Sequence, residues 1–184
     1  TPSGTTTVDY GSSQTYTVTP ATGYHVASFL VDGTTATLTA GTYTFSNVTA
    51  NHTIAVTFAI DTFVVTALAG PNGRITPTTP TVVYGGDQAF EISADTGYHV
   101  ADVMVDGNSV GAVTSYTFRN VTTTGHTIVA TFAIDTFTVN ATAGANGTIT
   151  PSGTTTVNYG SSQTYTVTPA TGYHVESVLV DGTA

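Results

Sequence analysis

The chain has 184 residues and a formal net charge of −9, because 11 acidic side chains face only two arginines and no lysine. Such a surface disfavours binding to nucleic acid or to an anionic membrane, and the absence of cysteine excludes disulfides and thiolate metal sites. No run of 18 apolar residues occurs, so no membrane-spanning helix is predicted. Hydrophobic residues make up 40% of the chain, which is enough for compact cores.

A repeat organises the whole sequence. The run Gly-Tyr-His-Val occurs at Gly23–Val26, Gly97–Val100 and Gly172–Val175, which are spaced 74 and then 75 residues apart. This period is longer than that of most solenoid repeats and suits a small independent domain. We therefore predict an array of one module rather than one or two unrelated domains.

Three copies of the module fit into the chain. Residues 62–135 form the complete copy. Residues 1–61 form a partial copy without the first hairpin arm, and residues 136–184 form a partial copy without the last strands. The unmatched strand edges of the partial copies invite strand addition. We expect a continuation of the polypeptide to supply the missing strands, with donation by a neighbouring identical chain in a filament as the alternative.

The complete copy opens with an alternating strand from Phe63 to Ala67. The dipeptide Asn72-Gly73 follows, and it predicts a hairpin because both residues tolerate positive φ. The returning strand contains Ile75 and ends at Pro77, which cannot donate a hydrogen bond to a central ladder. The next strand, Gln88–Ser93, alternates with a period of two, as a half-buried antiparallel strand does.

The Gly-Tyr-His-Val strand is less regular. Strict alternation from Tyr98 would bury the carboxylate of Asp102, whereas a bulge after Val100 keeps every inward position apolar. We therefore predict a bulge here, followed by a turn at Asp106-Gly107 and two more strands. The predicted core positions across the three copies are Tyr24, Val26, Phe90, Ile92, Tyr98, Val100, Ile128, Phe132, Tyr173 and Val175.

Val, Thr, Tyr and Phe are typical of strands, and no segment shows the 3.6-residue period of a helix. The predicted fold is all-β, a tandem array of small antiparallel, sandwich-like modules of about 74 residues each. Only the linker 59–62 separates the first two copies, without a flexible spacer. We expect Ile60 and Ile134 to pack at the junctions and neighbouring copies to be docked, so that a longer array would form a rod.

Several motifs occur in the order seen in one known family. Gly-x-Ile-x-Pro occurs at Gly73–Pro77 and Gly147–Pro151, Tyr-Gly precedes a Thr-rich strand, and His-Thr-Ile-x-x-x-Phe closes the copies at His52–Phe58 and His126–Phe132. The chain thus resembles the divergent InlB B-repeat family of bacterial cell-surface proteins. The resemblance implies tandem spacer or adhesive repeats with a β-grasp-derived fold, here without a clear helix, and it carries over no catalytic residue. Such repeats usually have Trp where Phe29, Val103 and Val178 stand here.

No constellation of residues predicts catalysis or a cofactor. His25, His99 and His174 recur, but the alternation places them outward, and too few ligands converge for a metal site. Asp61 and Asp135 lie at the junctions, where Ca²⁺ could stiffen an array, but each linker offers only one carboxylate. We therefore expect no enzyme activity, no cofactor and no metal.

The sequence favours a non-catalytic structural repeat of an extracellular or surface-anchored bacterial stalk, adhesin or filament, acting as a rigid spacer. The expected partners are neighbouring repeats of the same or an identical chain. The first alternative is a glycan-binding adhesive module, in which Tyr10, Tyr84 and Tyr159 would stack on sugars. The second is an ice- or mineral-binding surface of Thr arrays such as Thr154–Thr156. The irregular register at 78–82 argues against a lattice.

Overall fold

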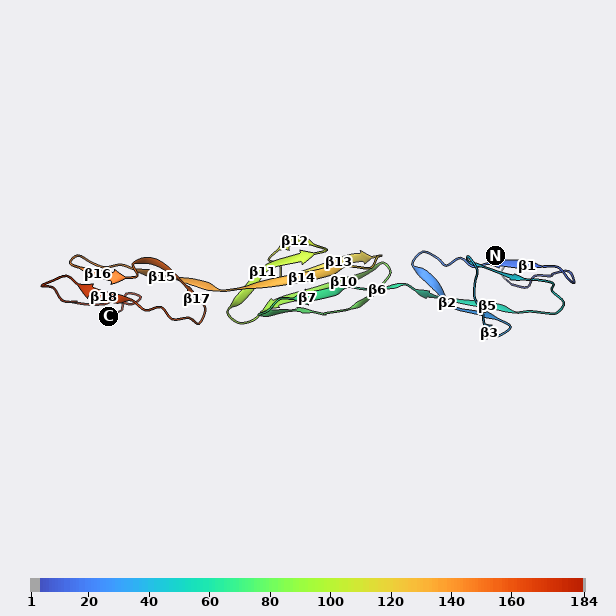
Figure 1. Cartoon of the computed structure of the whole chain (residues 1–184), viewed down its shortest axis with the longest axis horizontal. Coiled ribbons are helices and arrows are strands. Elements are labelled where there is room, and N and C mark those ends of the chain that lie inside the picture. The colour runs from blue at the N-terminus through green and yellow to red at the C-terminus, as the bar shows by residue number, and fades with distance from the viewer. Residues whose placement is uncertain (1–3, 184) are drawn as a thin grey trace. The chain divides into compact units, whose positions relative to one another are not determined.

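A computed structural model describes residues 4–183 of the chain (Figure 1). These residues form several small antiparallel sheets, with 54% of the chain in strands and no helix in the described part. The predicted all-β fold class is confirmed. Residues 4–183 contain no helix with the length and apolar character needed to cross a bilayer.

The chain forms two compact units whose limits do not follow the sequence repeat. One unit comprises Thr1–Thr66, Thr79–Ala89 and Thr117–His126, and the other comprises Ala67–Thr78, Phe90–Tyr116 and Thr127–Ala184. Residues 62–135 contribute to both units. The division into three copies therefore stays a prediction from the sequence.

The first unit contains most of the N-terminal strands. In the three-stranded sheet, β2 lies between β3 and β5, and the short pairs β1–β4 and β6–β9 form separate ladders. The strands of this unit are β1 (Gln14–Thr17), β2 (Tyr24–Val31), β3 (Thr34–Thr35), β4 (Thr42–Phe45), β5 (Ile54–Ile60), β6 (Thr62–Val64) and β9 (Thr81–Val83).

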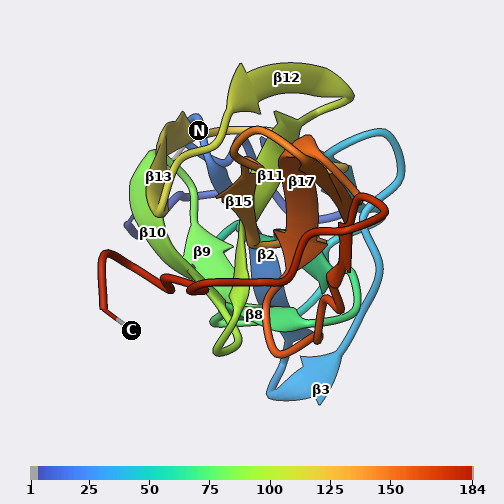
Figure 2. The same ribbon diagram turned by 90° about the vertical axis from the view of Figure 1, so that its left-hand side faces the viewer.

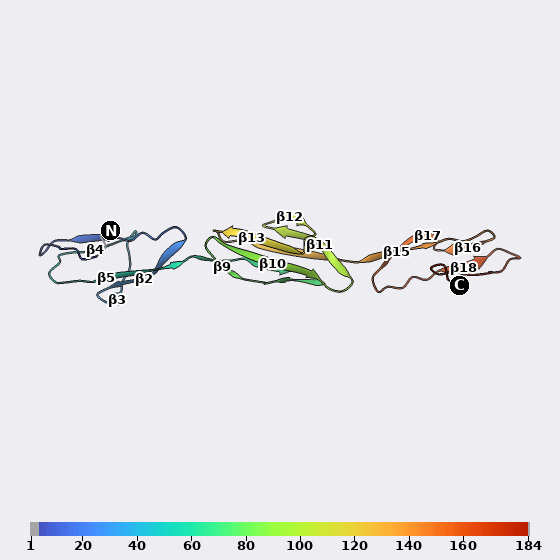
Figure 3. The same ribbon diagram turned by 180° about the vertical axis from the view of Figure 1, so that it is seen from behind.

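The second unit is built around a four-stranded sheet with the order β12-β11-β14-β7. Separate ladders join β8 to β10, β15 to β17 (Figure 2) and β16 to β18 (Figure 3). Strands β10 (Gly86–Ala94) and β13 (Ser115–Val121) have residues in both units, and so does β7, whose first residue Thr66 belongs to the first unit. The other strands are β7 (Thr66–Ala69), β8 (Gly73–Thr76), β11 (Tyr98–Val105), β12 (Asn108–Gly111), β14 (Thr127–Ile134), β15 (Thr136–Ala141), β16 (Gly147–Thr150), β17 (Gly153–Asn158) and β18 (Thr166–Pro169).

The predicted Asn-Gly hairpin is wrong in one respect. Asn72 and its counterpart Asn146 do turn the chain, with φ values of 70° and 64°. The strands on either side of Asn72, however, enter different sheets, because β7 pairs with β14 while β8 pairs with β10. The turn at Asn72 is as predicted. The turn does not specify which strands its two flanking strands pair with.

The predicted bulge lies where the sequence places it. Val100 pairs with Phe132 and Asp102 pairs with Thr131, so Ala101 is the extra residue on β11. The same shift occurs between Val26 and Ser28 on β2. As a result, Val103 is buried and the neighbouring Met104 is exposed.

The Asp-Gly turns are also as predicted. Asp106 and Gly107 have φ values of 48° and 81° and join β11 to β12, whose first paired residues are Val105 and Asn108. Positive φ at both central residues is the geometry that matches the right-handed twist of the flanking strands.

Apolar side chains form a core in each unit. In the first unit the buried residues are Phe29, Val65, Val82, Phe118 and Val121. In the second they are Ala67, Ile75, Phe90, Ile92, Val100, Val103, Val105, Ile128, Ala130 and Ala141. Of the remaining predicted core positions, Val26, Tyr98 and Phe132 are half-buried.

Three predicted core residues are instead exposed: Tyr24 by 44%, Tyr173 by 58% and Val175 by 43%. The sheet that carries Tyr24 has three strands, and no equivalent of β7 flanks β5 at its side. Tyr173 and Val175 lie in a segment without strand structure. Val100, which corresponds to Val175 in the sequence repeat, is buried on β11, which pairs with β14.

Candidate functional site: the linker aspartates

One aspartate separates the last strand of each copy from the first strand of the next. Strand β5 ends at Ile60 and β6 begins at Thr62, so Asp61 alone lies between them, and Asp135 lies in the same way between β14 and β15. This corrects the predicted four-residue linker 59–62. Ile60 and Ile134 are half-buried strand residues that pair with Tyr24 and Tyr98.

The backbone of each linker aspartate is hydrogen-bonded on both sides. The N–H of Asp61 donates to the carbonyl oxygen of Gly23 at 2.8 Å, and its own carbonyl oxygen accepts from the N–H of Tyr84 at 2.8 Å. Asp135 repeats both bonds at 2.8 Å, with Gly97 and Tyr159 as partners. Each linker residue therefore contacts a turn that precedes it by nearly 40 residues and a turn that follows it by more than 20.

The side chain of each linker aspartate accepts a hydrogen bond from a histidine. Nδ1 of His25 lies 2.7 Å from Oδ1 of Asp61, and Nδ1 of His99 lies 2.8 Å from Oδ1 of Asp135. An ionised carboxylate only accepts, so Nδ1 carries the proton. The imidazoles are 57% and 56% exposed, and exposed pairs of this kind contribute about 0–1 kcal/mol. These pairs therefore contribute little to the stability of the fold.

A tyrosine ring covers the glycine at each junction. A β-carbon built on Gly23 would overlap the ring of Tyr84, and one built on Gly97 would overlap the ring of Tyr159. Both glycines also have positive φ, 78° and 81°, a region that disfavours side chains. Gly23 and Gly97 are thus required both by backbone conformation and by space.

This geometry does not suit a metal ion. Ca²⁺ takes six to eight oxygen ligands, whereas each junction brings together one carboxylate and one histidine. Across residues 4–183, no group of three or more histidine, aspartate or glutamate side chains is placed to hold a metal.

A further aspartate of the first unit, Asp32, accepts hydrogen bonds from the segment that precedes β5. Its Oδ1 accepts from the backbone N–H of Thr53 at 2.7 Å, and its Oδ2 lies 2.8 Å from Nδ1 of His52. The backbone hydrogen bond from Thr53 and then the hydrogen bond from His52 hold the pKa of Asp32 below its ordinary value. In the second unit, Oδ1 of Asp106 accepts from the N–H of Thr127 at 2.8 Å.

The sequence pattern of the divergent InlB B-repeat domain matches residues 1–62 and 137–184, more than half of the chain. The chain belongs to this family. Comparison with curated proteins and with solved structures gave no match. B-repeats are repeat domains of bacterial surface proteins and are generally non-catalytic.

Sequence reasoning placed the histidines of these B-repeats outward, which agrees with their exposure, but missed their pairing with the linker aspartates. His25 precedes Asp61 by 36 residues and His99 precedes Asp135 by the same interval. Any two residues that recur in a repeat keep their separation, so this spacing alone does not indicate a contact. For His174 the equivalent position falls beyond residue 184.

Proposed function

We propose that this chain is a non-catalytic structural part of a bacterial stalk, adhesin or filament, located outside the cell or at its surface, in which the B-repeats act as rigid spacers. The observation that carries the proposal is the linker aspartate, whose N–H and C=O are both hydrogen-bonded at 2.8 Å to turns of different copies. A one-residue linker held on both sides leaves little freedom for neighbouring copies to turn.

The repetition of this arrangement supports a mechanical role. Gly23, Asp61 and Tyr84 make the same contacts as Gly97, Asp135 and Tyr159. A site that binds a ligand needs one good geometry, whereas a spacer needs the same geometry at every junction. The family membership supports the location, because B-repeats occur in bacterial surface proteins.

The glycan-binding alternative has less support. The rings of Tyr84 and Tyr159 lie against Gly23 and Gly97, which leaves less of each ring for stacking on a sugar. Tyr10 is 85% exposed and Tyr159 46%. A glycan array with wild type and Tyr10→Ala is the direct test of the alternative.

Small-angle X-ray scattering tests the spacer role. A variant with the four residues Gly-Ser-Gly-Ser inserted after Asp61 leaves the sequences of both copies unchanged. The insertion separates Asp61, which is bonded to Gly23, from the copy that contains Tyr84. The wild type is expected to scatter as one rigid particle. The insertion variant is expected to scatter as an ensemble in which the two copies adopt many relative orientations. Equal flexibility of the two proteins would refute the spacer proposal.

A further inference from the structure

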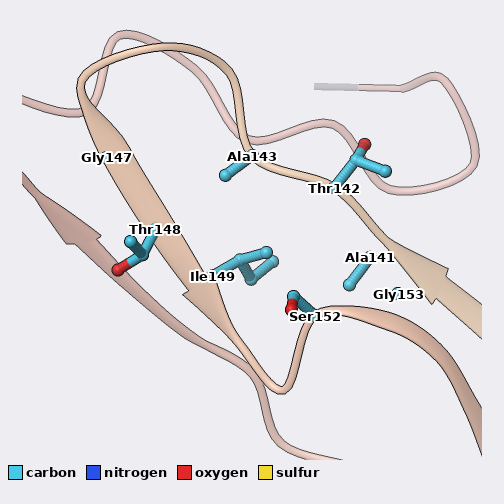
Figure 4. Close-up of a pocket in the computed structure, with 8 residues that line it drawn as sticks. All are labelled: Ala141, Thr142, Ala143, Gly147, Thr148, Ile149, Ser152 and Gly153. Atoms are coloured by element: carbon cyan, nitrogen blue, oxygen red, sulfur yellow. The ribbon is translucent and has the colours of Figure 1, made fainter.

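A hollow in residues 136–184 offers little to a ligand. It is lined by small side chains around Ile149, together with the hydroxyl groups of Thr142, Thr148 and Ser152 (Figure 4). None of its lining residues carries a charge or an aromatic ring, so it has few of the groups that give a ligand site its specificity. The hollow therefore indicates no class of ligand.

The first and the last strands of the complete copy lie side by side. Residues 62–135 begin with β6 and β7 and end with β14, and β7 is the neighbour of β14 in the four-stranded sheet. The N–H of Thr66 donates to the carbonyl oxygen of His126 at 3.0 Å, and the N–H of Gly70 donates to that of Ala130 at 2.9 Å. The partners advance together, from 66 to 70 and from 126 to 130, so the two strands run parallel.

Parallel pairing places the entry and the exit of the chain at opposite ends of this ladder. The chain enters the copy after Asp61, ahead of β7, and leaves it at Asp135, beyond the end of β14. Tension between the two linker aspartates therefore pulls β7 and β14 along their length in opposite directions. In this shear geometry the hydrogen bonds of the ladder bear the load together, whereas a pair of strands pulled apart from one end loses them one at a time.

The ladder is shielded from water. Val65, Ile128 and Ala130 are fully buried. On the other side of the first strand, the N–H of Ala67 donates to the carbonyl oxygen of Thr78 at 2.8 Å, so this strand is hydrogen-bonded along both edges. Water therefore has little access to replace a backbone hydrogen bond while the strands begin to slide.

We propose that the complete copy is built to resist tension, with the parallel pair β7–β14 as a mechanical clamp between Asp61 and Asp135. The use of such a clamp rests on the proposed function, because a spacer in a stalk or adhesin is stretched when its two ends are pulled apart. Rigid junctions alone do not give this property, since a rigid array can still unfold at low force. Resistance to force depends on the rate of unfolding rather than on equilibrium stability.

Stretching the intact chain from two pairs of points tests the clamp. The chain has no cysteine, so engineered cysteines are unique attachment points for the handles of an optical trap. Thr62→Cys with Thr136→Cys loads β7 and β14 at opposite ends of their ladder. Thr62→Cys with Thr124→Cys loads them at the same end, and all three positions are exposed. At equal loading rates, we expect the first pair to require about twice the unfolding force of the second, or more.

Thr66→Pro separates the clamp from overall stability. Proline removes the N–H that donates to His126, and the first residue of a strand is a position where proline is tolerated. The unfolding force between positions 62 and 136 should then fall toward that between positions 62 and 124, while the latter changes little. A general loss of stability would instead lower both forces by a similar factor.

Equal forces for the two cysteine pairs of the otherwise unchanged chain would overturn the clamp, whether or not Thr66→Pro folds. A similar fall of both forces in Thr66→Pro would also overturn it. These outcomes are distinct from a failure of the spacer role. A chain that scatters as one rigid particle but unfolds at equal force from both pairs keeps the spacer role and loses the clamp. A chain that scatters as a flexible ensemble but unfolds at unequal forces keeps the clamp and loses the spacer role.

Discussion

The ring of Tyr159 lies so close to the α-carbon of Gly97 that a β-carbon on this glycine would overlap it. The two residues are more than 60 positions apart, and Asp135 connects them by accepting from the N–H of Tyr159 and donating to the carbonyl oxygen of Gly97. A glycine, a tyrosine and one linker residue thus define the junction.

The first prediction concerns Gly97→Ala. Positive φ costs an L-residue about 1–2 kcal/mol, and overpacking against the tyrosine adds about 1–3 kcal/mol. Gly107→Ala is the matched control, because Gly107 has the same φ of 81° but no atom within 4 Å of a β-carbon. Gly107→Ala should therefore lose only the stability that positive φ costs, about 1–2 kcal/mol.

Amide exchange at single residues separates the two contributions. In Gly97→Ala the N–H groups of Asp135 and Tyr159 are expected to exchange faster, because both donate at this junction. In Gly107→Ala they should keep their protection. Equal thermal destabilisation by both variants would show that the tyrosine contact does not restrict residue 97.

The second prediction concerns the two faces of β11. Val103 is fully buried and Met104 is 39% exposed, although they are neighbours. Val103→Asp would place an unpaired charge in the core and should cost more than about 4 kcal/mol, whereas Met104→Asp should stay within about 1 kcal/mol. Thermal denaturation followed by circular dichroism measures the difference. Similar losses for both variants would contradict the bulge at Ala101.

The sequence predicted the features that depend on local chemistry. The bulge followed from the need to keep Asp102 out of an apolar face, and the turn at Asp106-Gly107 followed from the tolerance of both residues for positive φ. The inward positions Phe90 and Ile92 followed from a period of two.

The features that the sequence did not predict depend on residues distant in the chain. The strands on either side of Asn72 enter different sheets, and no local pattern specifies the partner of a strand. Tyr24 is 44% exposed although its position in the repeat matches that of the half-buried Tyr98, and alternation along one strand does not show how far its neighbours cover a side chain. The pairing of His25 with Asp61 joins positions 36 residues apart, and periodicity on one strand cannot reveal such a partner.

The third prediction is that Ca²⁺ does not stabilise the junctions. The carboxylate of Asp61 already accepts from His25, and a single carboxylate cannot build a cage of six to eight oxygens. Millimolar Ca²⁺ and a chelator should give the same thermal midpoint, because a ligand that does not bind the folded state cannot shift it. An upward shift with Ca²⁺ that disappears in Asp61→Asn together with Asp135→Asn would contradict this expectation.

The last prediction concerns pH and Asp32. Its pKa is lowered in the folded chain, chiefly by the hydrogen bond from the N–H of Thr53 and then by the one from His52. The ionised form is therefore the one that folding favours. Its stabilising contribution is complete above the ordinary carboxyl pKa of about 3.9 and is lost as the pH falls through that value toward the lower folded pKa.

Asp32→Asn removes the charge and keeps a residue that tolerates the φ of 50° at this turn. The variant should melt below the wild type at about pH 6, and the difference should shrink as acidification below the ordinary carboxyl pKa protonates Asp32. Asp181→Asn is the control, because Asp181 has the same φ and its carboxylate accepts no hydrogen bond from the residues that the structure describes. A difference between wild type and Asp32→Asn that grows on acidification would show that the carboxylate of Asp32 does not stabilise the fold.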